Sequence, residues 1–418
     1  KATGTDLFGN TVAAGTALTW SYTKVAPTTN NGALSAASSL CDAAGQASIV
    51  FTPSVLSGDQ FTVTATNGSI NATTPIITVI PNNTLASMVV VAPANAVAGT
   101  AFNLTATPYD MFNNVIGTYA GNVDITVAGA NSAPDGTAPM YPTIMAFVAG
   151  AGTASVTLYK MENAALTVTS SNVTVSGPSS VNVAAGAVDR YTADNFSANQ
   201  IVGAPFNVTI TPYDSWDNIA VGGVVTLTAV APDTVGTLTG NLYTNGTMTN
   251  PTANTAGGIT IVQNVIYTKP ETIDINVTDG SETNNILTTT NIIVARTTVV
   301  ASITVTNPAA AITVAAGASH TVMATGYDAW GSTVAAGASL TWTYNKIGAT
   351  TNNATLASGT TDTDANGQAT VVFTPSVTAG DQYTVTAAVG TVTGTSANIT
   401  VVHNNTVGSL TFAKTVAG

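Results

Sequence analysis

Aspartate recurs beside an aromatic residue at four places in this sequence, in a pattern that could bind a cation or close a turn. Carboxylate oxygens are ligands for calcium, and an aspartate also accepts backbone N–H groups in turns. The four stretches are TGTDLFGNTV from Thr3, TPYDMFNNVIG from Thr107, TPYDSWDNIAVGG from Thr211 and TGYDAWGSTVAAG from Thr325.

The four copies separate constant from variable positions. The aspartate that is present in every copy is Asp6, Asp110, Asp214 or Asp328. The second aspartate of the third copy, Asp217, is Gly9, Asn113 or Gly331 elsewhere. Glycine and asparagine tolerate a positive φ, and an aromatic side chain can cover the end of a β-sandwich. The pattern therefore predicts a structural turn at the four constant aspartates, and any chemistry special to the third copy would come from Asp217.

The best candidate for calcium is DTDANG, with the spacing of an oxygen-ligand loop at Asp362, Asp364 and Asn366. However, Phe373 stands at the twelfth position, where such a loop needs a bidentate glutamate. The corresponding segment near the N-terminus has leucine and alanine at the first and fifth positions. A turn before a strand is the favoured interpretation, calcium is the alternative, and no other cofactor is predicted.

Residues for catalysis are few. His320 and His403 are the two histidines, and neither lies in a serine or cysteine nucleophile motif. Glu162 and Glu271 each follow a lysine by two residues, at the same position of two repeats. This spacing predicts an ion pair rather than an acid/base pair, and the protein is not expected to be an enzyme.

The composition excludes several classes. Charged residues make up 7% of the 418 residues, against about 25% in ordinary soluble domains. A net charge of -12 argues against nucleic acid as a partner. The single cysteine, Cys41, cannot form a disulfide within the chain. The sequence contains no run of 18 or more apolar residues, so no membrane span is predicted.

Asn-x-Ser/Thr triplets are numerous and are candidates for glycosylation. Together with the low charge they predict an extracellular, cell-surface location, with surface glycans as an alternative partner. The triplets begin at Asn67, Asn71, Asn82, Asn103, Asn172, Asn195, Asn207, Asn245, Asn276, Asn353, Asn398 and Asn404.

The chain contains internal repeats. Residues 2–84 align without a gap on residues 324–406, at a constant offset of 322. Two copies of a related second type lie between them. The predicted immunoglobulin-like domains are 1–84, which lacks a first strand, 85–187 and 188–297 of the second type, and 298–406, which is a copy of the first. Residues 407–418 resemble the opening of the domain at residue 85 and are expected to be the first strand of a following domain or a strand donated to another copy; both alternatives stay open.

Apolar residues alternate with Thr, Ser and Asn over runs of five to eight residues, for example in QFTVTA and DINVTD. This period of two predicts half-buried antiparallel strands. Seven or so strands per 100 residues indicate a tandem array of all-β, immunoglobulin-like β-sandwich domains. Trp20 and Trp342 are predicted to face the core with Leu18 and Leu340.

The repeats resemble a known family. D-x-[FW]-G-N-x-V, D-A-A/N-G-Q-A-x-V-x-F-T and G-D-Q-[FY]-T-V-T-A are similar to the bacterial immunoglobulin-like repeats of invasin and intimin type, which also occur in surface-layer, sheath and adhesin proteins. The likeness is good for residues 2–84 and 298–406 and looser between them.

The resemblance implies a secreted array that serves as a stalk, coat or adhesive surface, without a shared catalytic site. The expected function is a structural protein that self-assembles into a cell-surface layer, sheath or filament. The alternative is an adhesin stalk that presents a cell- or glycan-binding tip. Its local candidate is a patch in the third domain with Arg190, Tyr191, Phe196 and Tyr243.

Overall fold

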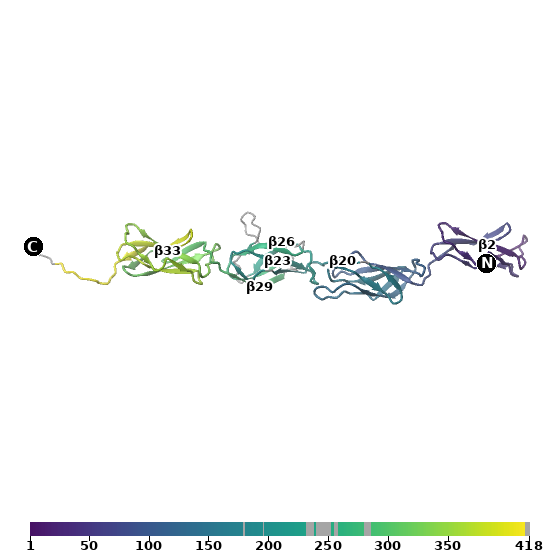
Figure 1. Cartoon of the computed structure of the whole chain (residues 1–418), viewed down its shortest axis with the longest axis horizontal. Helices are drawn as coiled ribbons and strands as arrows, with labels where there is room; N and C mark the ends of the chain where they lie inside the picture. The colour runs from purple at the N-terminus through teal and green to yellow at the C-terminus, as the bar shows by residue number, and fades with distance from the viewer. Residues whose placement is uncertain are drawn as a thin grey trace. The chain divides into compact units, whose positions relative to one another are not determined.

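The regular structure consists of strands alone. The computed structural model describes residues 1–178, 180–194, 196–230, 238–239, 252–254, 258–279 and 286–413. Among these residues the regular elements are β-strands and none is a helix, so the all-β prediction is confirmed (Figure 1). It follows that this part of the chain contains no helix able to cross a membrane.

Two compact units make up the chain. The first consists of Lys1–Gly186 together with Trp216–Asn218, and the second of Ala187–Ser215 together with Ile219–Gly418. Each unit contains two hydrophobic cores, one in each predicted domain. The three residues 216–218 thus pack with the first unit, although the chain on both sides of them belongs to the second.

The first domain has one larger sheet and two short strand pairs. The sheet has the order β4-β2-β7-β8, with β9 also on β7, and the pairs are β1-β5 and β3-β6. The strands are β1 (Ala2–Thr3), β2 (Ala17–Val25), β3 (Ala33–Leu34), β4 (Ser38–Leu40), β5 (Gln46–Ala47), β6 (Phe51–Thr52), β7 (Gln60–Asn67), β8 (Ile70–Thr73) and β9 (Ile77–Thr78).

The fourth domain is a two-sheet sandwich with the orders β30-β32-β36-β34 and β31-β39-β37-β33-β35, and β38 pairs with β37. Its strands β33, β37 and β38 match β2, β7 and β8 at the same offset of 322. The strands are β30 (Ser302–Asn307), β31 (Ile312–Ala315), β32 (His320–Tyr327), β33 (Ser339–Ile347), β34 (Thr355–Leu356), β35 (Thr360–Asp362), β36 (Gln368–Thr374), β37 (Gln382–Val389), β38 (Val392–Thr395) and β39 (Ile399–Val402).

The second domain has a six-stranded sheet, β13-β15-β16-β12-β10-β19, together with β11-β20-β17 and β14-β18. The strands are β10 (Ser87–Val91), β11 (Asn95–Val97), β12 (Phe102–Tyr109), β13 (Gly121–Asp124), β14 (Thr126–Ala128), β15 (Ile144–Val148), β16 (Ala151–Val156), β17 (Glu162–Ala164), β18 (Thr167–Thr169), β19 (Thr174–Ser176) and β20 (Val181–Ala184).

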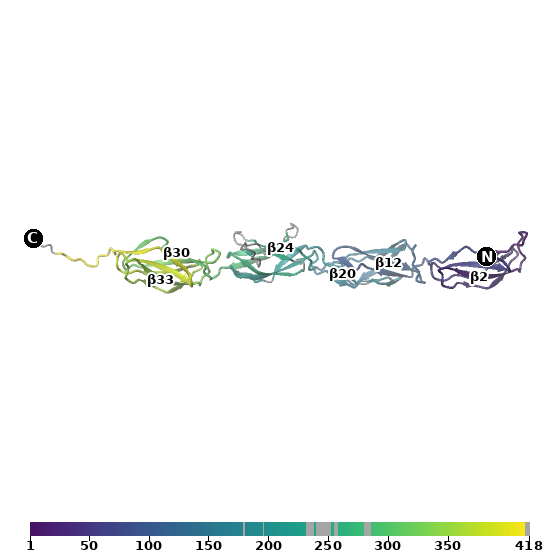
Figure 2. The same ribbon diagram turned by 90° about the horizontal axis from the view of Figure 1, so that it is seen from above.

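The third domain has the sheets β21-β23-β27-β25 and β22-β29-β28-β24-β26. Its strand β24 is labelled in Figure 2. The strands are β21 (Arg190–Asp194), β22 (Asn199–Ile201), β23 (Phe206–Tyr213), β24 (Val224–Val230), β25 (Leu238–Thr239), β26 (Thr252–Asn254), β27 (Thr260–Tyr267), β28 (Thr272–Thr278) and β29 (Ile286–Ala295).

The alternating sequence is the reason that the strands form sandwiches. Along β37 the apolar residues Tyr383, Val385 and Ala387 are fully buried, and the residues between them are not. Because successive side chains point to opposite faces of a strand, one face enters the core and the threonine-rich face meets water. Leu340 and Trp342 on β33 are buried in the same core, as predicted.

Residues 407–413 form no strand, and Leu410 and Phe412 are exposed. The two alternatives for the pairing of this segment stay predictions, and residues 414–418 lie outside the described residues.

We expect Leu340→Ala to lower the free energy of unfolding of the fourth domain by about 2–5 kcal/mol, because it opens a cavity in a fully buried place. Scanning calorimetry of the whole chain measures this as a downward shift of one transition. The neighbouring Thr341→Ala on the exposed face is the control and should change stability by less than about 0.5 kcal/mol. Equal effects of the two changes would contradict this account of the core.

Candidate functional site

The repeated aspartate lies at a corner, where it binds the backbone that follows it. Asp110 Oδ1 accepts the N–H groups of Phe112 and Asn114 at 2.9 and 2.8 Å. Its Oδ2 accepts the N–H of Asn82 at 3.0 Å and the Nδ2 amide of Asn114 at 2.9 Å. One carboxylate therefore satisfies four donors and fixes the loop between two strands.

Two other copies repeat this geometry. Asp6 Oδ1 accepts the N–H groups of Phe8 and Asn10, both at 2.9 Å. Asp328 Oδ1 accepts those of Trp330 and Ser332, again at 2.9 Å. In every copy, including the one at Asp214, the residue before the aspartate forms an isolated antiparallel β-bridge with the residue six positions after it. This β-bridge closes the corner.

The variable position of the motif has a positive φ. It is +84° at Gly9, +67° at Asn113, +65° at Asp217 and +85° at Gly331. Glycine, asparagine and aspartate are the residues that adopt this left-handed conformation most readily. The backbone of the corner thus accounts for the aspartate at position 217.

The corner aspartates differ in burial. Asp110, Asp214 and Asp328 are 2%, 0% and 3% exposed, whereas Asp6 is exposed. Burial tends to raise the pKa of Asp110, but hydrogen bonds from Asn114, Asn82 and Phe112 outweigh it and hold that pKa below its ordinary value. Among the described residues, Asp328 Oδ2 is buried without a hydrogen-bond partner, because Ser332 stands where Asn114 donates to Asp110.

The asparagine four residues after the aspartate also binds the domain that precedes its own. Asn114 Nδ2 donates to the carbonyl of Val55 at 2.8 Å, and Asn114 Oδ1 accepts the N–H of Ser57 at 2.8 Å. A carbonyl and an N–H two residues apart are what a neighbouring parallel strand uses for pairing. The side-chain amide therefore replaces one peptide group of such a strand.

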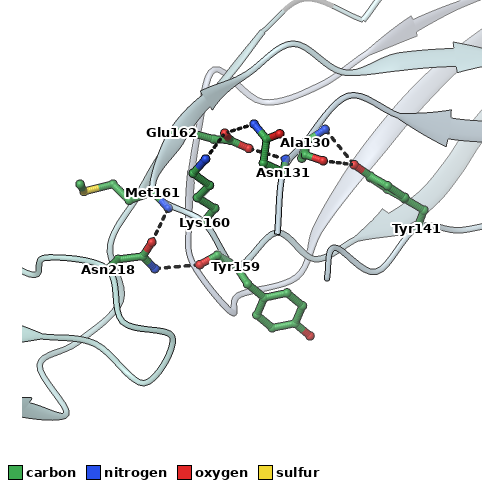
Figure 3. Close-up of polar contacts among 8 residues, drawn as sticks. All are labelled: Ala130, Asn131, Tyr141, Tyr159, Lys160, Met161, Glu162 and Asn218. Carbon is green, nitrogen blue, oxygen red and sulfur yellow. Dashed lines mark hydrogen bonds and ion pairs between the residues drawn. The ribbon is translucent and has the colours of Figure 1, made fainter. Parts of the chain in front are cut away.

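The same contact recurs in the first unit at Asn218. Its Nδ2 donates to the carbonyl of Tyr159 at 2.7 Å, and its Oδ1 accepts the N–H of Met161 at 2.8 Å (Figure 3). We name the segments that bind a corner asparagine the receiving loops; they are residues 54–58 and 159–162.

Aromatic residues of the corners cover glycines. Trp216 lies over Gly99 so closely that a Cβ there would be 1.8 Å from the indole ring, and it packs against Tyr159 with 5.4 Å between ring centroids. Trp330 lies over Gly203 with the same 1.8 Å spacing. Both glycines also have a positive φ, +74° and +75°. Any other residue is therefore disfavoured both by the backbone conformation and by the clash of its Cβ with the indole ring. Phe112, the equivalent aromatic residue in the corner of the second domain, is 45% exposed.

Carboxylates inside each domain hold the receiving loops in place. Asp59, of the GDQ motif, accepts hydrogen bonds from Ser54 and from Asn30. Glu162 accepts the N–H and the side-chain amide of Asn131, both at 2.7 Å, and pairs with Lys160 at 3.5 Å (Figure 3).

The charge on Glu162 is stabilised by the same contacts. Burial tends to raise the pKa of Glu162, but the bonds from Asn131 and the charge of Lys160 hold it below the ordinary value. Glu271 pairs with Lys269 at 3.0 Å, so the two ion pairs predicted for the second type of domain are confirmed.

The other predicted site residues lie apart from the corners. Asp364 Oδ1 accepts the N–H groups of Asn366 and Gln368 at 2.8 and 2.9 Å, in a turn like that of the corner. Asp362 ends β35 and is exposed. Cys41 is buried. The described residues contain no group of three or more His, Cys, Asp or Glu side chains that could hold a metal ion.

The glycosylation candidates are placed as follows. Asn195 and Asn245 lie outside the described residues. Of the others, Asn276 is half-buried, and the exposed side chains are Asn67, Asn71, Asn82, Asn103, Asn172, Asn207, Asn353, Asn398 and Asn404.

The prediction that Tyr191 belongs to an exposed aromatic patch of the third domain is wrong. This residue is 1% exposed, belongs to the core and donates its hydroxyl to Asp279. Phe196 packs on Phe206, and the Arg190 guanidinium lies 4.8 Å from the ring of Tyr213. Tyr243 lies outside the described residues. The alternation of β21 places Tyr191 inward, which a list of aromatic residues does not reveal.

Sequence reasoning missed the two asparagines that bind the receiving loops. Asn114 and Asn218 were not singled out, although asparagine follows the corner aspartate by four residues in three of the four copies. Asp59 was used only as part of a repeated motif. The recurrence of both residues was a usable signal, but their binding partners are distant backbone groups that no motif contains.

A scan against protein-family models found no match, and a search of curated proteins found no relative. Solved structures do match. One is the Escherichia coli adhesin FdeC, at 14% identity and a TM-score of 0.39, covering 76% of this chain and 98% of that one. Another is the Yersinia pseudotuberculosis adhesin InvE, at 22% identity and a TM-score of 0.24, covering 53% of this chain and 64% of that one.

A third match is the S-layer protein rSbsC(31-844), at 17% identity and a TM-score of 0.26. It covers 93% of this chain, which spans about half (51%) of that structure. The first two of these structures are of adhesins, and the third is of an S-layer protein.

We expect Asn114→Ala to expose the amide of Ser57, because the side-chain oxygen that accepts this N–H is removed. Hydrogen exchange followed by mass spectrometry should show faster exchange at Ser57, by roughly the tenfold that one net hydrogen bond contributes. Asn122→Ala, at an exposed position on β13, is the matched control. Unchanged exchange at Ser57 would contradict the contact.

The lowered pKa of Asp110 predicts a dependence on pH. A folded-state pKa below the ordinary value of about 3.9 adds stability above that value, and the contribution is lost as pH falls through the folded pKa. The difference in melting temperature between the native protein and Asp110→Asn should therefore shrink below about pH 4. Asp124→Asn, exposed on β13, is the control. A difference that stays constant from neutral pH to about pH 2 would contradict the prediction.

Proposed function

We propose that the protein is an extracellular structural protein whose copies associate into a cell-surface layer, sheath or filament. The observation that supports this most directly is the contact between a corner asparagine and a receiving loop. Its two halves lie on different surfaces of a domain, so it is heterologous and can be repeated in series. Heterologous contacts generate open assemblies when the rotation between neighbours does not close.

Groups that correspond to both halves of this contact are exposed in the first and fourth domains. At the corner of the first domain Leu7 is 98% and Phe8 88% exposed, and Asn10 is held by Asp6 through its side-chain amide at 3.2 Å. In the fourth domain the segment that corresponds to the receiving loop 54–58 contains Val377, which is 77% exposed. A corner of one copy and this loop of another therefore offer complementary groups.

The surface chemistry supports close packing outside the cell. Threonine, serine and asparagine solvate the exposed strand faces, and the low charge keeps repulsion between copies small. The exposed glycosylation candidates fit an extracellular protein. The adhesin alternative has less support, because the aromatic patch that would form its tip includes the buried Tyr191.

The proposal predicts association that depends on concentration and on the first corner. Analytical ultracentrifugation and negative-stain microscopy of the native protein should show polymers that grow with concentration. Phe8→Ala with Asn10→Ala should shift the distribution toward monomer, whereas Val50→Ala, also exposed in the first domain, should not. A protein that stays monomeric at high concentration, or that binds glycans or cells saturably without self-association, would refute the proposal.

A further inference from the structure

Two domains that align without a gap differ at the residue that follows the corner aspartate by four positions. The first and fourth domains align without a gap, yet Asn10 of the first is Ser332 in the fourth. Both follow the corner aspartate by four residues, and both donate a backbone N–H to it. Because Asn114 and Asn218 use this position to bind a receiving loop, the loop that the serine corner meets is of interest.

The loop that corresponds to residues 159–162 in the third domain is defined by its contacts. Gly99 donates its N–H to Leu158 at 2.8 Å, and Gly203 donates its N–H to Tyr267 at 2.9 Å. Trp216 covers Gly99, and Trp330 covers Gly203. The Lys-x-Glu ion pair follows in both loops, at 3.5 and 3.0 Å.

This correspondence aligns Met161 with Pro270. Met161 supplies the N–H that Asn218 Oδ1 accepts, and proline has no N–H to supply. An asparagine at position 332, placed as Asn218 is, would direct its Oδ1 at Pro270, which has no N–H to donate, and an unsatisfied buried acceptor is unfavourable. Serine avoids this, although Asp328 then lacks the amide bond that Asp110 receives.

We propose that the residue four positions after the corner aspartate and the residue of the receiving loop that faces it, Ser57 or Met161 in the first unit, form a matched pair, which determines which domain can precede which. An asparagine corner takes a loop that offers an N–H group, and a serine corner takes a loop with proline. This inference is independent of the proposed function, because it concerns contacts within each unit.

The matched pair specifies partners for all four domains. The loop of the first domain offers the N–H of Ser57 and is followed by Asn114. The aligned residue of the fourth domain is Ala379, so its loop also accepts an asparagine corner. Asn10 therefore fits a loop that offers an N–H group, such as those with Ser57, Met161 or Ala379, and not a loop of the Pro270 kind. The first and fourth domains are consequently not interchangeable.

Hydrogen exchange with single-residue resolution, on the whole chain, tests the pair. Pro270→Met creates a new amide, which should exchange rapidly while serine remains at position 332. In the double variant P270M/S332N the new asparagine oxygen accepts this N–H, and exchange at position 270 should slow roughly tenfold, as one net hydrogen bond implies. The double variant P270M/S332A is the matched control and should leave the amide unprotected.

The reciprocal pair keeps the test decisive if Pro270→Met impairs folding. Met161→Pro removes the N–H that Asn218 accepts and should lower the melting temperature of the first unit. The further change Asn218→Ser should then lower the melting temperature of the first unit by less in the Met161→Pro variant than in the native protein. Equal exchange at position 270 with and without S332N, or additive effects of Met161→Pro and Asn218→Ser, would overturn the proposal.

Discussion

The buried carboxylate of Asp110 is the interaction on which the contact between the first and second domains depends. A carboxylate out of water is costly unless hydrogen bonds satisfy it, and Asp110 receives four. One of them comes from the side-chain amide of Asn114, which fixes the orientation of that amide. Its second hydrogen and its oxygen are then directed at Val55 and Ser57. The turn and the domain joint are thus one hydrogen-bonded network.

The two receiving loops have unrelated local sequences but offer the same backbone groups. In the first domain the segment TPSVLSGDQ is held by Asp59, and in the second the segment LYKMEN is held by Glu162. Both offer a carbonyl and an N–H two residues apart. Because the asparagine binds only backbone groups, side chains in the loop are free to vary as long as the N–H remains. Proline is the one residue that removes this N–H group. The loop that contains Pro270 therefore cannot donate a hydrogen bond at that position.

The surface and the joints suit a protein whose role is mechanical. The sandwiches bury their own cores, so each domain has its own source of stability. Threonine-rich strand faces and few charged residues leave an exterior with a low density of charge. Under the function that we propose, specificity would reside at the corners and the receiving loops.

The sequence by itself determined the all-β fold, the repeats and the inward direction of Leu340 and Trp342, because a period of two in hydrophobicity is a local property of the strand. It also predicted the ion pairs of Glu162 and Glu271 from a spacing of two residues. Tertiary structure alone decided the role of Asn114 and Asn218. Their partners lie 57 to 59 residues away and are backbone atoms, which carry no residue-type signal. The same reason explains Tyr191, whose burial depends on the register of β21 against β23 and not on its chemistry.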